Sequence, residues 1–260
     1  MGTISVKKAN TIAELNWAAW LRCSVFADEF AYLDPLHFPA GREVDGFDLL
    51  PTTVNFLGLV DGEPAATVRL LFPNPDVATR CQIRLGLNIE RHLDLHHIRP
   101  DMALAEIPRS SVLKPYRRTG IMRHLYFAAY EESLKRGSTH WVAVANTETD
   151  CEADASTVLR LLEARGWWLS DFDARHRKAD KPAAPSRYPL YTEAQRDQVR
   201  QGNNKDVLLP RTLELFASKV GVRYFGSPYF DSDFRMFAIP LIMHMPDFAA
   251  APYGSLTEAA

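Results

Sequence analysis

The residues best suited to chemistry lie in one stretch of the chain, from Glu106 to Gly137. Glu106 stands in an apolar segment just before Pro108, which cannot donate a ladder hydrogen bond and therefore predicts a bulge or an edge. A bulge can turn a strand residue into a cleft, so Glu106 is a candidate general base, acting directly or through a water molecule. The alternative is a structural ion pair, because buried charges are usually paired. The arginines available for it are Arg109, Arg22 and Arg69.

The same stretch contains a turn, Pro115-Tyr116-Arg117-Arg118-Thr119-Gly120, that comes directly before a long amphipathic segment. Backbone N–H groups at the start of a helix are unpaired, and the helix dipole attracts a phosphate there. Gly120 would let the backbone approach an anion closely, while Arg117 and Arg118 could add positive charge. An ordinary strand-to-helix turn with exposed arginines explains this turn equally well when it is taken alone.

Strands and helices alternate along the chain, which predicts the mixed α/β class. Thr11 and Glu14 have capping-box spacing and begin a helix predicted over Ile12–Phe30, in one piece or two. Asp61-Gly62 predicts a hairpin between strands at Thr53–Val60 and Ala65–Phe72. The other predicted elements are an irregular strand Met102–Leu113, a helix Gly120–Arg136, a strand His140–Ala145, a helix Ala155–Arg165 capped by Asp154, a strand Trp167–Phe172, helices near Glu193–Gln201 and Arg211–Val220, and strands Arg223–Phe225 and Arg235–Met243.

Composition excludes several classes of function. The net charge of -2 argues against nucleic acid as the main partner. The longest apolar runs, Thr53–Val60 and Phe237–Met243, are too short to span a bilayer, and no secretory signal is predicted. Three widely separated cysteines suit a reducing cytoplasm, where we expect the protein to act.

Three histidines close together, His92, His96 and His97, raise the question of a metal site, because the first two are one helical turn apart. No partner set with zinc-like spacing completes the group. We therefore expect surface histidines and predict no metal.

Two short motifs carry a first family resemblance. Arg117-x-x-Gly120, followed by a helix and then a strand, resembles the pyrophosphate-binding motif of the GCN5-related N-acyltransferases (GNAT). The family usually has Gly or Ala two residues after that glycine, where this chain has Met122. The segment Leu161–Trp167 similarly resembles a later helix-then-strand motif of the family.

A longer series of motifs resembles one branch of that superfamily. Four motifs resemble those of the acyl-homoserine-lactone synthases. In chain order they are Leu21-Arg22-x-x-Val25-Phe26, Asp45-x-Phe47-Asp48, Arg69-Leu70 and Glu106-x-x-Arg109. The related N-acyl amino acid synthases are resembled by Pro210–Phe216, Gly221 and Gly226-x-Pro228-x-x-Asp231-x-x-Phe234.

The resemblance implies a single twisted mixed sheet, flanked by helices, with a V-shaped cleft between two splayed central strands for a pantetheine arm. It implies one acyltransferase domain over residues 1–250, followed by a tail at 251–260. Within that domain we predict an exposed basic loop at about 174–189 and an extension of the sheet from about 190. No cofactor would be bound permanently, because the acyl-phosphopantetheine thioester is a co-substrate.

Roles for individual residues follow from the same resemblance and from thioester chemistry. An amine can attack a thioester directly, so the protein must supply a base, oxyanion donors and positioning. The predicted catalytic residues are Glu106, Arg109 and Ser111, with backbone N–H groups around Ser111–Leu113 as oxyanion donors. The predicted thioester-binding residues are Val112, Leu113, Arg117, Arg118, Thr119, Gly120 and Met122. The predicted acceptor-binding residues are Arg22, Phe26, Asp45, Asp48 and Arg69, although salt bridges that fix a loop would also explain Asp45 and Asp48.

The sequence thus predicts a bacterial enzyme that transfers a fatty acyl group from acyl carrier protein, or from coenzyme A, to the amine of an amino acid or similar small amine. The basic loop could dock the carrier protein, or could be an ordinary solvated loop. The alternatives are a homoserine-lactone synthase that uses S-adenosylmethionine, a simple acetyltransferase and a non-catalytic acyl-binding or carrier-protein-binding module, which Met122 keeps open.

Overall fold

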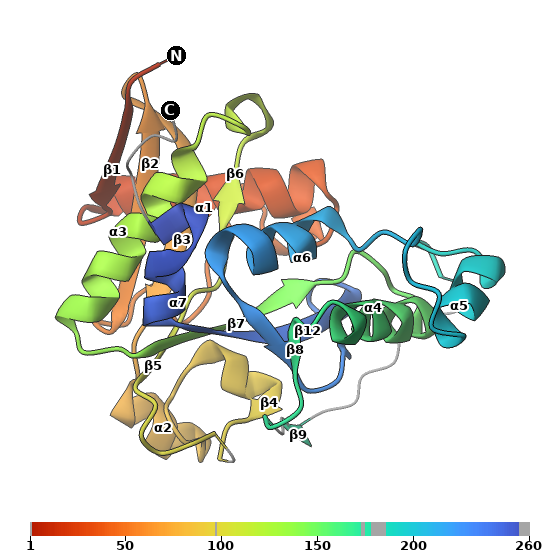
Figure 1. Ribbon diagram of the computed structural model, residues 1–260. Helices are drawn as coiled ribbons and strands as arrows, with labels where there is room; N and C mark the ends of the chain where they lie inside the picture. The colour runs from red at the N-terminus through yellow and green to blue at the C-terminus, as the bar shows by residue number, and fades with distance from the viewer. Residues whose placement is uncertain (1, 97, 173–174, 178–185, 255–260) are drawn as a thin grey trace.

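One open mixed sheet runs through the molecule, with helices on both faces (Figure 1). The computed structural model describes residues 2–96, 98–172, 175–177 and 186–254. In sheet order, the strands are β1 (Ile4–Lys8), β2 (Thr53–Val60), β3 (Glu63–Leu71), β5 (Leu104–Glu106), β7 (His140–Asn146), β12 (Met236–His244), β10 (Arg223–Phe225) and β8 (Trp168–Leu169). Two short strands lie off this path: β6 (Ser111–Val112) pairs with β3, and β11 (Tyr229–Asp231) pairs with β12.

The two central strands separate partway along their length. β5 pairs with β7 in parallel from Leu104 opposite His140 to Glu106 opposite Val142, and the Ile107 N–H still donates to the Val142 carbonyl at 3.0 Å. Beyond Ile107 the described residues show no ladder pairing between these strands, because β6 pairs with β3 instead. The predicted mixed α/β sheet with splayed central strands is confirmed.

Helices cover the sheet unequally. The first, α1 (Ile12–Cys23), begins at the Thr11–Glu14 capping box and continues as a π-helical segment, Ser24–Glu29. It lies on one face of the sheet, while α3 (Ile121–Lys135) lies on the other (Figure 1). The remaining helices are α2 (Pro75–Cys81), α4 (Glu152–Ala164), α5 (Glu193–Arg200), α6 (Arg211–Leu215), which continues as a π-helical segment Phe216–Val220, and α7 (Met245–Ala250). Short 3₁₀ turns lie at η2 (Pro35–His37), η3 (Asn88–Arg91), η4 (Lys114–Tyr116) and η6 (Pro252–Gly254).

Alternation along the strands decides which face Glu106 occupies. Ala105 belongs to the apolar core under α3, whereas Leu104 belongs to a second core on the opposite face. Successive strand residues point to opposite faces, so Glu106 shares the face of Leu104. Its antiparallel neighbour Leu71 lies in that second core as well. Arg69, two residues before Leu71, therefore also faces this side.

Several predicted elements need correction. Asp154 is not the cap of α4: the helix begins at Glu152, and the buried Asp154 carboxylate accepts hydrogen bonds from the Leu190 N–H and from Arg196, both at 2.7 Å. The predicted strand Trp167–Phe172 is reduced to β8. β1, α2, β11 and α7 were not predicted.

The predicted basic loop is partly a strand. Arg175 and His176 form β9, which pairs with β4 (Leu93–Asp94) in a separate two-stranded sheet. This pairing corrects the expectation of a loop at these positions, while residues 173–174 and 178–185 lie outside the described part of the chain. No helix in the described ranges is long and apolar enough to cross a membrane.

Candidate active site

Glu106 occupies the point where the central strands begin to separate. Its side chain is 2% exposed. One carboxylate oxygen accepts a hydrogen bond from the Ile89 N–H at 2.9 Å, and the other accepts one from Asn88 Nδ2 at 3.4 Å. Both donors belong to η3, so this short turn holds the carboxyl group against the end of β5.

The pKa of Glu106 is shifted toward neutrality. Burial raises the pKa to about 7, while the Ile89 N–H, the charges of Arg69 and Arg109 and the Asn88 amide act in the opposite direction. Within the described residues Glu106 forms no ion pair, so the structural alternative predicted from the sequence is wrong. A carboxyl group with a pKa near the working pH can accept and release a proton, as a general base must.

A network of three arginines and three carboxylates lies on the same face of the sheet. Arg22, in α1, is 1% exposed. It contacts Glu43 through Nε and donates to Asp48 at 2.8 Å and to the Asn55 side chain at 3.1 Å. These contacts join α1 to β2 and to the loop of residues 43–48.

The other two arginines complete the network. Arg69 donates to both oxygens of Asp45 at 2.8 Å and approaches Asp48 at 3.2 Å. Arg109 donates through Nε to Glu43 at 3.0 Å. The three positive and three negative charges balance, and the contacts favour the loop-fixing interpretation of Asp45 and Asp48.

Glu43 is a buried member of this network that sequence reasoning missed. Burial raises the pKa of Glu43, but the charges of Arg109, Arg22 and Arg69 outweigh it and hold the pKa below its usual value. No motif around position 43 marks the residue, because its role depends on arginines far away in the chain.

Arg109 adopts a strained backbone conformation. Its φ is 59°, in the left-handed region that non-glycine residues rarely occupy. The residue belongs to the irregular segment between β5 and β6. Its guanidinium group lies over the Phe234 ring at 4.7 Å, and Phe26 meets the same ring edge-on at 5.5 Å. The predicted residues Arg109 and Phe26 therefore meet at Phe234, a residue of the predicted motif with no assigned role.

Several buried polar atoms on this part of the sheet and beside it have no hydrogen-bond partner among the described residues. They are Arg69 Nε, Asn88 Oδ1, Ser111 Oγ and Tyr229 Oη. Unpaired buried polar groups are rare in native proteins and mark places where a polar ligand or water can bind. Asn88 contacts Glu106, and Arg69 and Tyr229 lie close enough to interact with it electrostatically, so this face of the sheet is the candidate active site.

The turn before α3 presents free backbone N–H groups. Arg118 and Gly120 have φ values of 75° and 88°, and the N–H groups of Arg118, Gly120 and Met122 donate no hydrogen bond within the described chain. Thr119 stabilises the turn locally, donating to the Tyr116 carbonyl at 2.7 Å and accepting from the Ile121 N–H at 3.4 Å. Such alternating amides form a concave anion-binding geometry.

Two groups near this turn, the Arg117 side chain and the Leu113 N–H, differ from the sequence-based expectation. Arg117 does not extend toward the turn: it pairs with Glu29 and lies over the Phe30 ring at 5.1 Å. The Leu113 N–H donates to the Ala65 carbonyl at 3.0 Å, so the prediction of an oxyanion donor there is wrong. Met122 packs against the core and leaves its own N–H at the turn.

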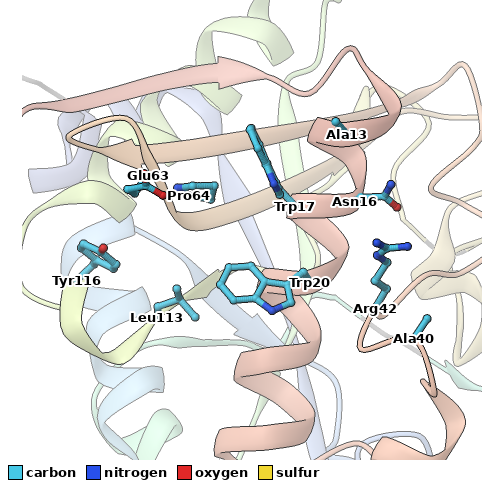
Figure 2. Close-up of a pocket in the computed structure, with 10 residues that line it drawn as sticks. All are labelled: Ala13, Asn16, Trp17, Trp20, Ala40, Arg42, Glu63, Pro64, Leu113 and Tyr116. Carbon is cyan, nitrogen blue, oxygen red and sulfur yellow. The ribbon is translucent and has the colours of Figure 1, made fainter.

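An open depression of about 710 Å³ lies at the end of β6. Figure 2 shows Trp17 and Trp20 of α1 on one side and Leu113 and Tyr116 on the other. Leu113, one of the predicted thioester-binding residues, lines this depression, and Val112 comes just before it in the chain.

Of the three histidines, His92 is not on the surface as predicted. It is half-buried, and its ring stacks on Tyr229 with ring centroids 5.3 Å apart. His96 is exposed and pairs with Asp94, and His97 lies outside the described residues.

Comparisons with known proteins bear on the whole arrangement. Residues 21–127 match the family described as "Acetyltransferase (GNAT) domain", a range that contains every site residue predicted from the sequence. The fold is similar to that of FeeM, an N-acyl amino acid synthase from uncultured soil microbes, at 8% identity over 96% of each chain with a TM-score of 0.54. It is also similar to BjaI, a CoA-dependent acyl-homoserine lactone synthase, at 16% identity over 99% of this chain and 92% of that chain with a TM-score of 0.51. A search of curated proteins finds no significant match.

Residues 21–127 thus match the GNAT acetyltransferase domain, and the whole chain shares the fold of acyltransferases that contain such a domain. The predicted likeness to N-acyl amino acid synthases and acyl-homoserine lactone synthases is confirmed at the level of the fold.

Proposed function

We propose that the protein transfers a fatty acyl group from a phosphopantetheine thioester, carried by acyl carrier protein or coenzyme A, to the amine of an amino acid or similar small amine. The observation that carries the proposal is Glu106, a buried carboxyl group with no ion-pair partner in the described chain and a pKa of about 7. It stands where β5 and β7 separate, which is where a thioester arm would enter.

The reaction would need no nucleophile from the protein. The amine nitrogen attacks the thioester carbonyl carbon, and the carbon–sulfur bond breaks as the tetrahedral intermediate collapses. Glu106 accepts the proton that the nitrogen loses, directly or through water, and the sulfur leaves as a thiolate, which takes up a proton from protonated Glu106 or from solvent. We assign oxyanion donation to Ser111 in β6, whose buried hydroxyl has no partner among the described residues.

The donor half of the site is supported by the turn before α3. The free N–H groups of Arg118, Gly120 and Met122 offer hydrogen bonds to a phosphate or to a pantetheine carbonyl. The side chain of Met122 lies against the core, so its departure from the usual small residue leaves the amide accessible.

The acceptor half of the site is supported by the aromatic contact at Phe234. Arg109 and Phe26 both meet this ring, and Arg109 is linked through Glu43 to Arg22. A guanidinium group beside an aromatic ring suits an acceptor that carries a carboxylate.

The experiment that tests the proposal pairs two donors with several acceptors. Purified protein is incubated with acyl carrier protein or coenzyme A, each carrying acyl chains of several lengths, and with tyrosine, other amino acids or S-adenosylmethionine. Products are identified by mass spectrometry. An N-acyl amino acid supports the proposal, and an acyl-homoserine lactone supports the alternative. Absence of any acylated acceptor would overturn both.

A further inference from the structure

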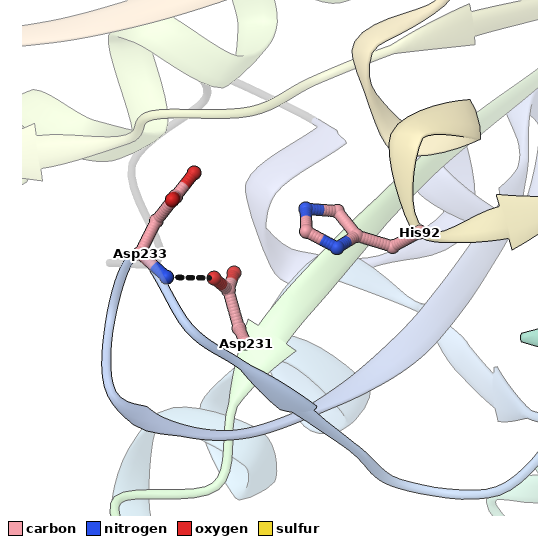
Figure 3. Close-up of side chains that lie close together, drawn as sticks. All are labelled: His92, Asp231 and Asp233. Atoms are coloured by element: carbon pink, nitrogen blue, oxygen red, sulfur yellow. Dashed lines mark hydrogen bonds between the residues drawn. The ribbon is translucent and has the colours of Figure 1, made fainter. Parts of the chain in front are cut away.

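A cluster of metal-ligating side chains lies beside the candidate active site. The side-chain donor atoms of His92, Asp231 and Asp233 all lie within 4.8 Å of one another. Figure 3 shows His92 reaching the group from the end of η3, while both aspartates come from β11 and the turn that follows it. The three residues thus bring together two segments that are far apart in the chain.

Asp231 is held in place before any ligand binds. One of its carboxylate oxygens accepts hydrogen bonds from the backbone N–H groups of Asp233 at 2.9 Å and of Phe234 at 3.3 Å. The residue is 6% exposed, yet no Lys, Arg or His within the described residues forms an ion pair with it. Burying a carboxylate without a counter-charge is costly, so a cation at this position would be stabilised.

Independent support comes from the residues around the cluster. No hydrogen bond occupies the imidazole nitrogens of His92 within the described part of the chain. Tyr229, whose ring stacks on His92, is 5% exposed, and its hydroxyl has no hydrogen-bond partner in the same part of the chain. Because the Tyr229 ring stacks on His92, its buried hydroxyl and the imidazole belong to one region, and both lack a hydrogen-bond partner in the described part of the chain, as at a place where a polar ligand binds.

We propose that His92, Asp231 and Asp233 bind one divalent first-row transition metal ion, of the Zn²⁺, Mn²⁺ or Co²⁺ class. One imidazole and two carboxylates suit these ions, whereas Ca²⁺ takes six to eight oxygen ligands. The two carboxylate charges neutralise a divalent ion, and the open coordination positions are available to water. Arg91 competes with the ion, because its guanidinium lies 3.3 Å from the Asp233 carboxylate. Both partners of that pair are about half exposed, so the contact is weak.

The bound ion would connect two segments that border the candidate active site, the η3 turn and the turn after β11. The η3 turn that precedes His92 holds Glu106 through Asn88 and Ile89. Phe234, which follows Asp231 and Asp233, supports Arg109. Binding would therefore fix the distance between the base and the predicted acceptor side. The metal site stands on these contacts alone and does not depend on the proposed acyl acceptor.

The experiment measures binding of the metal itself to the full chain. After treatment with a chelator and dialysis, the protein is titrated with ZnCl₂, MnCl₂ and CoCl₂ by calorimetry, and its Tm is recorded with and without each ion. We expect one equivalent of one of these ions to bind and to raise Tm, since a ligand that binds only the native state stabilises it. His92→Gln and Asp231→Asn should each weaken binding about tenfold or more.

Two further variants test whether the binding comes from the proposed ligands. His96→Gln alters an exposed histidine that also contacts an aspartate, and should leave the affinity unchanged. Arg91→Ala removes the competing charge and should strengthen binding. Circular dichroism verifies that each variant is folded, and Arg91→Ala still tests the site if a ligand variant is not. Absence of saturable binding to the wild-type protein, or equal affinity in His92→Gln and His96→Gln, would overturn the proposal.

Discussion

Two glutamates on the same face of the sheet are equally buried and have opposite chemistry. Glu43 and Glu106 are each 2% exposed. Burial acts to raise the pKa of both, but the arginines around Glu43 reverse its shift, while the pKa of Glu106 rises to about 7. The difference lies in their partners: Glu43 contacts two guanidinium groups, and Glu106 accepts hydrogen bonds from a backbone N–H and an amide.

The comparison shows how one protein can use the same side chain for two purposes. A carboxylate surrounded by permanent cations stays ionised and fixes the geometry of its neighbours. A carboxyl group buried without such partners can change its protonation state near neutral pH. Arg109 lies between the two, since it pairs with Glu43 and also lowers the pKa of Glu106.

The largest expected effect is on catalysis at Glu106. Glu106→Gln preserves size and hydrogen bonding but removes the proton acceptor, so kcat should fall about 10²–10⁴-fold. Wild-type kcat/KM should rise with pH to a plateau through a pKa near 7, because only the ionised form of Glu106 is a base. Steady-state kinetics across pH measures both effects.

Binding of the thioester provides the control for this variant. Glu106→Gln should bind acyl-coenzyme A or acylated carrier protein as the wild type does, since Glu106 is assigned to proton transfer. A variant that retains full turnover, or a pH profile without a limb near 7, would mean that Glu106 is not the base.

A smaller effect, on stability, is expected at Glu43. Glu43→Gln leaves Arg22 and Arg109 buried beside an uncharged partner, which should lower the free energy of unfolding by about 3 kcal/mol. Urea denaturation measures the loss. Asp101→Asn is the matched control, because its pair with Arg99 is exposed and should contribute nothing measurable. Equal stability of Glu43→Gln and the wild type would show that the network does not stabilise the fold.

An effect of similar size is expected in the pH dependence of stability, which should differ between the two glutamates. The pKa of Glu106 rises from 4.5 to about 7 on folding, so its favourable contribution is complete below pH 4.5 and is lost as pH rises toward 7. Relative to wild type, Glu106→Gln should therefore gain up to about 3 kcal/mol across that interval.

Glu43 should show the opposite trend. Its pKa is lowered on folding, so its contribution is present above its unfolded pKa and is lost as pH falls through its folded pKa. Unfolding free energies of wild type, Glu106→Gln and Glu43→Gln, measured at several pH values, compare the two directly. Parallel curves for the three proteins would remove the distinction between the two sites.

Much of the fold could be predicted from local signals. The capping box at Thr11 and the turn Asp61-Gly62 each predicted an element that the structure contains. The irregular strand around Pro108 is the point at which β5 and β6 separate. Asp154 was wrongly predicted to be a helix cap. An aspartate near the start of a helix gives the same sequence pattern whether it caps the helix or, as here, accepts hydrogen bonds from a distant segment.

The site was less predictable because its contacts are tertiary. Sequence motifs indicated Glu106 and Arg109. They did not indicate that Glu106 has no ion-pair partner among the described residues, because Glu43 and Asp45 pair with the nearby arginines instead. His92 was expected at the surface because its neighbours along the chain offer no ligand set. Asp231, which lies near His92 in space, comes from a much later part of the chain.

Because β5 and β7 separate, the two sides of the candidate active site belong to different stretches of the chain. One side consists of β3, β5 and β6, and the other of β7 with β12 beside it. The carboxyl group that we assign to proton transfer belongs to the first side alone. Under the proposed function, substitutions along β7 and β12 other than at Val142, which pairs with Glu106, would change which acyl chains fit without replacing the acid–base group.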